Sequence, residues 1–394
     1  MSISHSIRES MVKGSWIRQM FEAGARLKAE HGAENVFDFS LGNPILEPPE
    51  QVHEQIKRLL EKSEHGMHRY MPNAGFGETR EFIAGVMRDE TGYPFGSEDI
   101  VMCVGAGGGL NVVFKALLEA GDEVLALTPY FVEYGAYVQN HGGRLTLAET
   151  TSEFQPDLDS IEASLSEHTK IVIINSPNNP TGAVYSQQIL DELAQLLFRK
   201  EKDYGHPIYL VSDDIYRYIV FDGFKNSNVF LSYPNSILVN SHSKDLGLAG
   251  ERIGYIAIHP HVFGKEELYQ ALVLCNRILG FVNAPAMMQK ILPLLGNEKV
   301  DISVYEKLRD KMFSMISDLG FEAIKPQGAF YIFPKSPDTD DVAFVKRAQQ
   351  EHILLVPGVG FGGPGHFRIS LCCTLDTIEN SLPGFKRLAE YYCL

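Results

Sequence analysis

Short apolar runs alternate with stretches of helical periodicity through the middle of the chain. The runs lie at residues 99–104, 123–128, 170–175, 207–212, 237–239 and 253–258. A continuous apolar run of strand length is typical of a strand that is buried on both faces. The alternation of strands and helices from about residue 99 to 258 therefore predicts an α/β fold with a mostly parallel, doubly wound sheet.

The pattern changes after about residue 290. A helical stretch near Val300–Leu319 precedes short apolar runs at 329–333, 354–356 and 367–371. These elements predict a smaller α+β domain, which we expect the N-terminal segment to complete. That segment is a polar arm followed by an amphipathic helix. The apolar face of this helix is formed by residues near helical spacing, which are Ile17, Met20, Phe21, Ala25 and Leu27.

We therefore expect two domains. Residues 1–45 form the N-terminal arm and part of the small domain, residues 46–290 form the large domain, and residues 291–394 form the rest of the small domain. A chain of 394 residues, of which 44% are hydrophobic, can bury a core of the size that this arrangement needs.

Charge and cysteine content narrow the choice of partners and compartment. Thirty-five basic and 50 acidic residues leave a net charge of −15, which argues against nucleic acid and against an anionic membrane as partners. No apolar run approaches the length that crosses a membrane. The five cysteines form no disulfide framework or metal-binding spacing, and residues 1–11 resemble no secretory or transit peptide. We expect a cytoplasmic protein without a metal site.

Lys244 is the first candidate for chemistry. It lies in a polar, glycine-containing loop between the apolar runs at 237–239 and 253–258. A lysine at the end of a buried strand has its pKa lowered by desolvation, and the positive charge of Arg252 would lower it further. A neutral amine is what Schiff-base chemistry requires. The alternative is a solvated loop lysine.

A glycine-rich segment, Gly105–Asn111, follows the strand predicted at 99–104 and precedes a helix predicted over Val112–Leu118. Backbone N–H groups and a helix N-terminus together make an anion site. Leu110 stands where a dinucleotide-binding loop needs its last glycine, and the lysine of a P-loop is missing. The segment therefore predicts a site for a single phosphate ester, although such turns also serve close packing.

Other polar and aromatic residues stand at predicted strand ends, where open α/β sheets bind ligands. Phe131 could stack on a ring or cap the core, and Asn179 lies in a rigid proline-containing loop. Asp213 could meet a protonated pyridine nitrogen or face the surface. Arg368, in the middle of an apolar run, could clamp a carboxylate or form a salt bridge with an acidic side chain.

These groups are together the set that pyridoxal phosphate chemistry on an amino acid requires. The chain also resembles the fold-type I PLP-dependent aminotransferases, class I/II, over nearly its whole length. The resemblance rests on Ser40–Pro44, Tyr70–Gly75, Asn178–Gly182, Ser212–Tyr216, Ser241–Lys244, Gly250–Arg252 and Phe367–Ser370.

The resemblance implies pyridoxal 5′-phosphate as cofactor and a role for each matching residue. Lys244 matches the Schiff-base lysine that also moves a proton, and Asp213 matches the partner of the pyridine nitrogen. Tyr216 and Asn179 match the groups that bind the phenolic oxygen, and Phe131 matches the stacking aromatic. The residues that match the phosphate-binding group are Gly105, Ala106, Gly107, Ser241 and Arg252.

The resemblance also implies a homodimer, because Tyr70 matches the tyrosine that reaches the phosphate of the neighbouring subunit. Arg368 matches the clamp on the substrate α-carboxylate, assisted by Asn179 and the backbone near Gly42. One position departs from part of the family. Many dicarboxylate-specific bacterial members carry a lysine that reads the distal carboxylate where this chain has Gly107. The substrate side chain is therefore left open.

The implied function is ping-pong transfer of an amino group from an L-amino acid to a 2-oxo acid through a Lys244 Schiff base. A C–S β-lyase or another eliminase on the same fold is the alternative, since it would share every cofactor-binding residue. A sensing domain of a transcription regulator is a third interpretation. It would need a DNA-binding domain before the motifs that begin at Ser40, and we expect none.

Overall fold

The structure is a computed structural model that describes residues 3–4, 7–8, 16–62 and 65–394. Of residues 17, 18 and 21 it describes the backbone only, so the predicted contacts of Ile17 and Phe21 lie outside the described side chains. The predicted N-terminal helix is α2 (Trp16–His31), and it buries Met20. Ala25, predicted to face the core, is exposed, and Ala23 is buried instead.

A seven-stranded sheet organises most of the chain, with the order β2-β8-β7-β6-β5-β3-β4. Neighbouring strands are parallel except that β8 runs antiparallel to both β2 and β7, which confirms the mostly parallel sheet. The strands are β2 (Ile100–Cys103), β3 (Glu123–Thr128), β4 (Arg144–Glu149), β5 (Thr169–Asn175), β6 (Tyr209–Asp213), β7 (Ser236–Ser241) and β8 (Gly254–Ile258). The sequence analysis predicted no strand at β4, because most side chains of this edge strand are accessible to solvent and form no apolar run.

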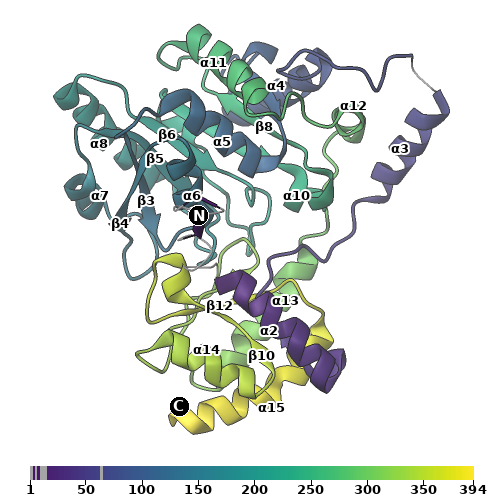
Figure 1. Ribbon diagram of the computed structural model, residues 1–394, viewed down its shortest axis with the longest axis vertical. Coiled ribbons are helices and arrows are strands. Elements are labelled where there is room, and N and C mark those ends of the chain that lie inside the picture. Colours follow the sequence, from purple (N-terminus) through teal and green to yellow (C-terminus); the bar gives the residue numbers. More distant parts are fainter. Residues whose placement is uncertain (1–2, 5–6, 9–15, 63–64) are drawn as a thin grey trace.

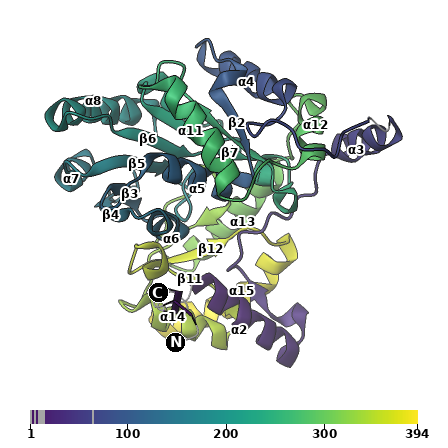
Figure 2. The ribbon, with the colours of Figure 1, turned by 45° about the horizontal axis from the view of Figure 1, so that its top comes forward.

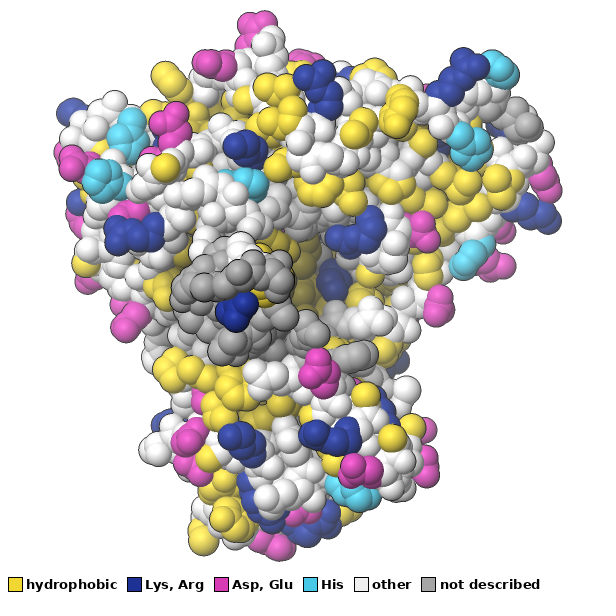
Figure 3. All heavy atoms as spheres, in the orientation of Figure 1, with side chains coloured by type: hydrophobic (Ala, Val, Ile, Leu, Met, Phe, Trp, Pro, Cys, Tyr) yellow, Lys and Arg dark blue, Asp and Glu magenta, His cyan; other side chains and the backbone are white. Residues whose placement is uncertain are grey.

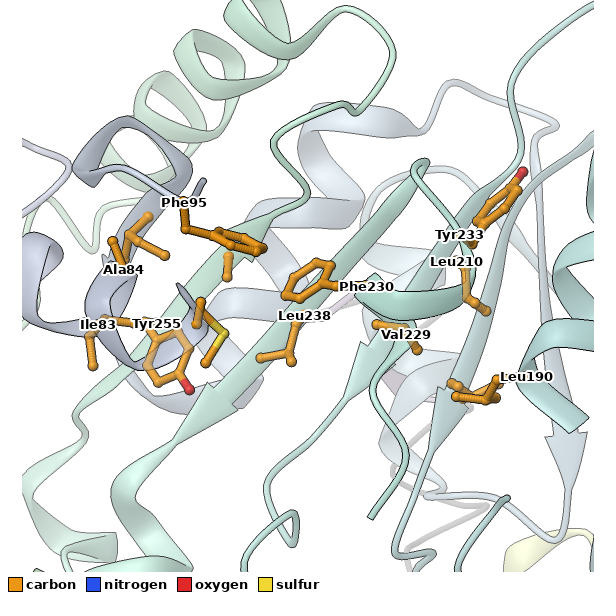
Figure 4. Packing of buried hydrophobic residues seen from close by; sticks show 14 of the residues in the cluster. Ile83, Ala84, Phe95, Leu190, Leu210, Val229, Phe230, Tyr233, Leu238 and Tyr255 are labelled. Carbon is orange, nitrogen blue, oxygen red and sulfur yellow. The ribbon is translucent and has the colours of Figure 1, made fainter. Parts of the chain in front are cut away.

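Helices cover both faces of this sheet (Figure 1). Successive side chains of a strand point to opposite faces, so each strand contributes to two separate hydrophobic clusters. Figure 4 shows one cluster, with Ile83 and Ala84 near Tyr255 of β8 at one end and Leu190 near Leu210 of β6 at the other. Burial on both faces is why these strands are continuous apolar runs in the sequence.

The helices of the described residues vary from single turns to eighteen residues. They are α3 (Glu50–Lys62), α4 (Gly77–Thr91), α5 (Gly105–Leu117), α6 (Glu133–Asn140), α7 (Leu158–Ser164), α8 (Gln187–Tyr204), α9 (Val229–Ser232), α10 (His242–Asp245), α11 (Lys265–Ile278), α12 (Ala286–Leu295), α13 (Ser303–Asp318), α14 (Asp341–Gln350) and α15 (Leu375–Tyr392). No helix in the described ranges is both long enough and apolar enough to cross a membrane.

The helix expected to begin at Val112 begins at Gly105 instead, so the glycine-rich segment is the first turns of α5 and not a loop. The reason is close packing of α5 on the sheet. A Cβ atom on Gly109 would come within 2.7 Å of Val239 Cγ1 and 2.9 Å of Cys103 Sγ. The missing side chain lets the helix backbone approach the strands, which outweighs the low helix propensity of glycine.

A third hydrophobic cluster belongs to the C-terminal part of the chain. There α13, α14 and α15 pack on small sheets, and the N-terminal segment joins them through β1, which pairs in parallel with β10. Met20 and Phe39 lie in the same cluster as Phe344 and Phe385, and Figures 1 and 2 show α2 beside α15. The small-sheet strands are β1 (Phe37–Asp38), β9 (Tyr331–Ile332), β10 (Ile353–Leu354), β11 (Val356–Pro357) and β12 (Phe367–Ser370).

The carboxyl ends of β3, β5, β6 and β7 meet at one edge of the large sheet, which faces the C-terminal part (Figure 2). Figure 3 shows a hollow with hydrophobic walls between the broad upper part of the molecule and the narrower lower part. Open α/β sheets bind ligands at such an edge.

Candidate active site

Lys244 lies on α10, directly after β7. Its Nζ atom donates a hydrogen bond to the carbonyl oxygen of Gly42 at 2.9 Å and lies 5.1 Å from the ring centre of Phe330. Burial, together with the positive charges of Arg368 and Arg252, lowers the pKa of Lys244 to about 8, against the raising effects of Cys372 and Asp213. The predicted depression of this pKa is confirmed, and a substantial fraction of the amine is neutral near pH 8.

Asp213 ends β6 and is 3% exposed. One carboxylate oxygen accepts a hydrogen bond from the hydroxyl of Tyr134 at 2.6 Å, whereas the other, Oδ1, has no partner of normal hydrogen-bond geometry among the described residues. Burial raises the pKa of Asp213 to about 7, against the lowering effects of Tyr134 and the nearby N–H of Ile215. A buried carboxylate with a free oxygen is costly unless it meets a positive partner.

Arg368 on β12 is 1% exposed, and its guanidinium lies between the rings of Tyr331 and Phe361, 4.5 and 4.7 Å from their centres. It donates hydrogen bonds to Asn179 Oδ1 at 3.1 Å and to the carbonyl of Ser40 at 2.6 Å.

No carboxylate within the described ranges forms an ion pair with Arg368, and its Nε atom has no hydrogen-bond partner there. The alternative of a structural salt bridge is therefore wrong. A buried cation without an anion indicates a site for an anionic ligand.

Tyr216 and Asn179 line the same cavity as the lysine and the arginine, and the Tyr216 ring centre is 5.9 Å from Lys244 Nζ. The Tyr216 hydroxyl is 3.0 Å from the Tyr331 hydroxyl. The backbone N–H of Asn179 donates to Asn175 Oδ1 at 2.7 Å, and Asn175 in turn donates to the carbonyl of Asp213 at 2.7 Å. Side chains from the ends of β5 and β6 are thus held in a fixed relation to Arg368 of the C-terminal part.

The predicted phosphate-binding residues form a second group beside these. Gly105, Ala106 and Gly107 are the first turn of α5, so their backbone N–H groups are not consumed within the helix. A Cβ atom on Gly105 would come within 2.6 Å of Arg252 Nη2, which places the guanidinium at this helix start. Ser241 is buried at the N-terminus of α10, where its hydroxyl donates to Ser243 Oγ at 3.0 Å.

A cavity of about 260 Å³ lies where Lys244, Asp213 and Arg368 meet, and its lining does not include the predicted phosphate-binding residues. It is lined by Gly42, Phe131, Asn175, Asn179, Asp213, Ile215, Tyr216, Lys244, Tyr331 and Arg368. Tyr70 is not among them, since it is 90% exposed on another surface, beside Phe281 and Val282.

Four residues at the site were not predicted: Tyr134, Asn175, Ile215 and Tyr331. Tyr134 lies in the first turn of α6, three residues after Phe131, and the two rings meet edge to face; its closeness to Phe131 in the sequence could have signalled its role. Tyr331 carried no signal, because its apolar strand is indistinguishable from a core strand in the sequence.

The site contains the Lys244 amine, whose pKa is lowered, and the Asp213 carboxylate, one oxygen of which has no partner among the described residues. Beside them, the N-terminus of α5 and Arg252 could bind an anion. This is the donor set that a phosphorylated pyridine aldehyde requires, so fold and site define an enzyme built around such a cofactor and a carboxylate-bearing substrate. The chain belongs to the family Aminotransferase class I and II, whose profile it matches over residues 34–383. Members of this family use pyridoxal 5′-phosphate.

Named relatives cover most of the chain. It is 31% identical over 360 residues to the aspartate/prephenate aminotransferase of Thermus thermophilus, covering 88% of this chain and 89% of that protein. It is 29% identical to aromatic-amino-acid aminotransferase 2 of Thermococcus litoralis, covering 98% of each.

Solved structures with a similar fold also belong to aminotransferases. An aminotransferase from Eubacterium rectale matches with a TM-score of 0.97 and 39% identity over 100% of this chain and 99% of that one. The aspartate aminotransferase of Thermus thermophilus with maleate matches with a TM-score of 0.85 and 27% identity, covering 98% of this chain and 100% of that one. The protein is an aminotransferase with the fold of the aspartate aminotransferases, and these relatives favour amino-group transfer over the eliminase alternative.

Proposed function

We propose that this aminotransferase holds pyridoxal 5′-phosphate between Lys244 and Asp213 and there transfers an amino group from an L-amino acid to a 2-oxo acid. The observation that carries the proposal is the free oxygen of a buried Asp213 in the same cavity as Lys244, an amine of lowered pKa. When bound, the cofactor supplies a carbonyl carbon that amines attack and a ring that withdraws electrons from the substrate Cα.

Asp213 is assigned to the ring nitrogen, with Tyr134 holding its carboxylate in place. Phe131 faces the cavity as the stacking aromatic, and Tyr216 and Asn179 are assigned to the phenolic oxygen. The phosphate is assigned to the backbone at Gly105, Ala106 and Gly107 with Ser241 and Arg252. These assignments account for the groups whose burial or missing partners the protein alone does not explain.

Lys244 is the group that moves the proton. With a pKa of about 8, its Nζ atom exchanges a proton readily near neutral pH, which is what a general base and acid at the substrate Cα needs. The Gly42 carbonyl fixes the direction of Nζ. Arg368, already oriented by Asn179 and Ser40, is assigned to the substrate α-carboxylate. One clamp serves both the amino acid and the 2-oxo acid, as a ping-pong reaction requires.

The assembly is proposed as a homodimer in which Tyr70 completes the site of the neighbouring subunit. Support comes from its exposure of 90% and from its position beside the partly buried, apolar Phe281 and Val282. The domain boundaries 46–290 and 291–394 and a cytoplasmic location are parts of the same proposal. The five unpaired cysteines agree with a reducing compartment.

The test is the visible absorption of protein loaded with the cofactor. The wild-type protein is expected to show an absorption band that an amino acid bleaches and a 2-oxo acid restores, and Lys244→Ala is expected to show neither change. Bleaching that reverses without an oxo acid while ammonia appears would assign elimination instead. Full turnover by Lys244→Ala would refute the proposed role of the lysine.

A further inference from the structure

The hydroxyl of Tyr137 lies over the start of α5. A Cβ atom on Gly107 would come 3.0 Å from Tyr137 Oη, so the hydroxyl occupies the space into which a side chain at position 107 would extend. Tyr137 is half-buried on α6, a helix that contacts α5 (Figure 1). Within the described part of the chain its hydroxyl makes no hydrogen bond.

The surroundings of this hydroxyl are those of an anion site. Arg252 lies against Gly105, which shares the first turn of α5 with Gly107. A guanidinium and a hydroxyl therefore flank this turn. Burial raises the pKa of Tyr137 to about 12, with Glu133 and Asp213 adding to the effect and Arg252 opposing it. The hydroxyl therefore stays protonated at neutral pH and is available as a donor.

The run of glycines at 107–109 has two separate explanations. Gly109 is needed for packing, because a side chain there would collide with Val239 and Cys103. Gly107 meets no strand residue, and the atoms that a Cβ would approach belong to Tyr137. A side chain at position 107 would therefore press on the Tyr137 hydroxyl, which would have to shift to make room for it.

We propose that Tyr137 Oη donates a hydrogen bond to the phosphate of the bound cofactor and takes the place of a side chain at position 107. The inference rests on the proposed function and deepens it by adding one residue to the phosphate-binding group. A hydroxyl that donates to a charged phosphate oxygen forms a short, strong hydrogen bond. It supplements the helix N-terminus, whose N–H groups already favour an anion.

The experiment measures cofactor affinity and not turnover. Apoenzyme is titrated with pyridoxal 5′-phosphate and with pyridoxal, which lacks the phosphate, and inorganic phosphate is titrated as a competitor. Tyr137→Phe is expected to weaken binding of the phosphorylated cofactor about ten- to a hundredfold, the range for one hydrogen bond to a charged group. Binding of pyridoxal is expected to stay unchanged, and phosphate is expected to compete less well.

Tyr209→Phe is the matched control. Tyr209 is a buried tyrosine at the other end of β6 from Asp213, so its loss is expected to leave all three affinities unchanged. A reciprocal variant, Gly107→Ala, is expected to displace the Tyr137 hydroxyl and so to weaken binding of the phosphorylated cofactor when Tyr137 is present. In the Tyr137→Phe background it is expected to add little, because the hydroxyl is already gone.

Equal affinity of Tyr137→Phe and wild type for the phosphorylated cofactor would overturn the inference. So would an equal loss for the cofactor and for pyridoxal, since that result would assign Tyr137 to the ring or to packing. Failure of the wild-type protein to bind pyridoxal 5′-phosphate at Lys244 would instead refute the proposed function, and the absorption of the wild type alone distinguishes that case.

Discussion

Asp213→Asn is expected to stabilise the cofactor-free protein while it removes activity. The fold raises the pKa of Asp213 from 3.8 to about 7, mainly through burial. At about 1.36 kcal/mol per pKa unit, the folded apoprotein disfavours the ionised carboxylate by about 4 kcal/mol. Asparagine keeps an acceptor for Tyr134 and carries no charge.

The sign of the pH dependence follows from linkage. The unfolded chain loses the Asp213 proton near pH 3.8, whereas the folded protein holds it until about pH 7. Stability from this position is therefore highest below the unfolded pKa and falls as the pH rises toward 7. The advantage of Asp213→Asn should grow from below about 2 kcal/mol at pH 5 to about 4 kcal/mol at pH 8.

Urea unfolding of the apoproteins at pH 5 and pH 8, followed by circular dichroism, measures this difference. Adding pyridoxal 5′-phosphate should reverse the order, because only the ionised Asp213 gains a positive partner, and turnover of the variant should fall about a hundredfold or more. Asp203→Asn, at an exposed position on α8, is the control. An advantage for Asp213→Asn that does not change with pH would refute the reasoning.

Three further predictions concern other parts of the site. Arg368→Lys should raise KM for amino acids and 2-oxo acids alike by about tenfold or more, since a lysine cannot reproduce the planar two-point clamp; unchanged KM values in steady-state kinetics would contradict this. Tyr134→Phe removes a hydrogen bond that lowers the pKa of Asp213, so the acidic limb of the kcat/KM profile should move up by about one pH unit, and an unmoved limb would show that the bond has no such effect. Mixing Tyr70→Ala with Lys244→Ala should restore activity beyond either variant alone, because one of the two sites in the hybrid dimer would then be intact. Without that recovery, Tyr70 acts within its own subunit or not at all.

Much of this molecule could be predicted from local pattern. The parallel strands are buried on both faces, so β3, β5 and β6 stand out as continuous apolar runs, and the polar residues that follow them collect at one edge of the sheet. This reasoning alone places Phe131, Asn179 and Asp213 at the same edge of the sheet. It failed for β4, an edge strand whose side chains are mostly accessible.

The glycine-rich segment shows a different limit. Its composition indicated an irregular loop, and only the packing of Gly109 against Val239 and Cys103 makes it the start of α5. Helix propensity is a local property, whereas the closeness of this helix to the sheet depends also on β7, which lies more than a hundred residues further along the chain.

Residue identity was therefore enough to indicate the family, the cofactor chemistry and the edge of the sheet where it takes place. Tertiary structure alone decided the state of those residues. Contacts between segments far apart in the chain decide which groups lack a partner among the described residues, as Asp213 Oδ1 and Arg368 Nε do, and where the hydroxyls of Tyr134, Tyr137 and Tyr331 lie. Burial and charge, which set the pKa values of Lys244 and Asp213, are sums over such contacts and have no local signature in a sequence.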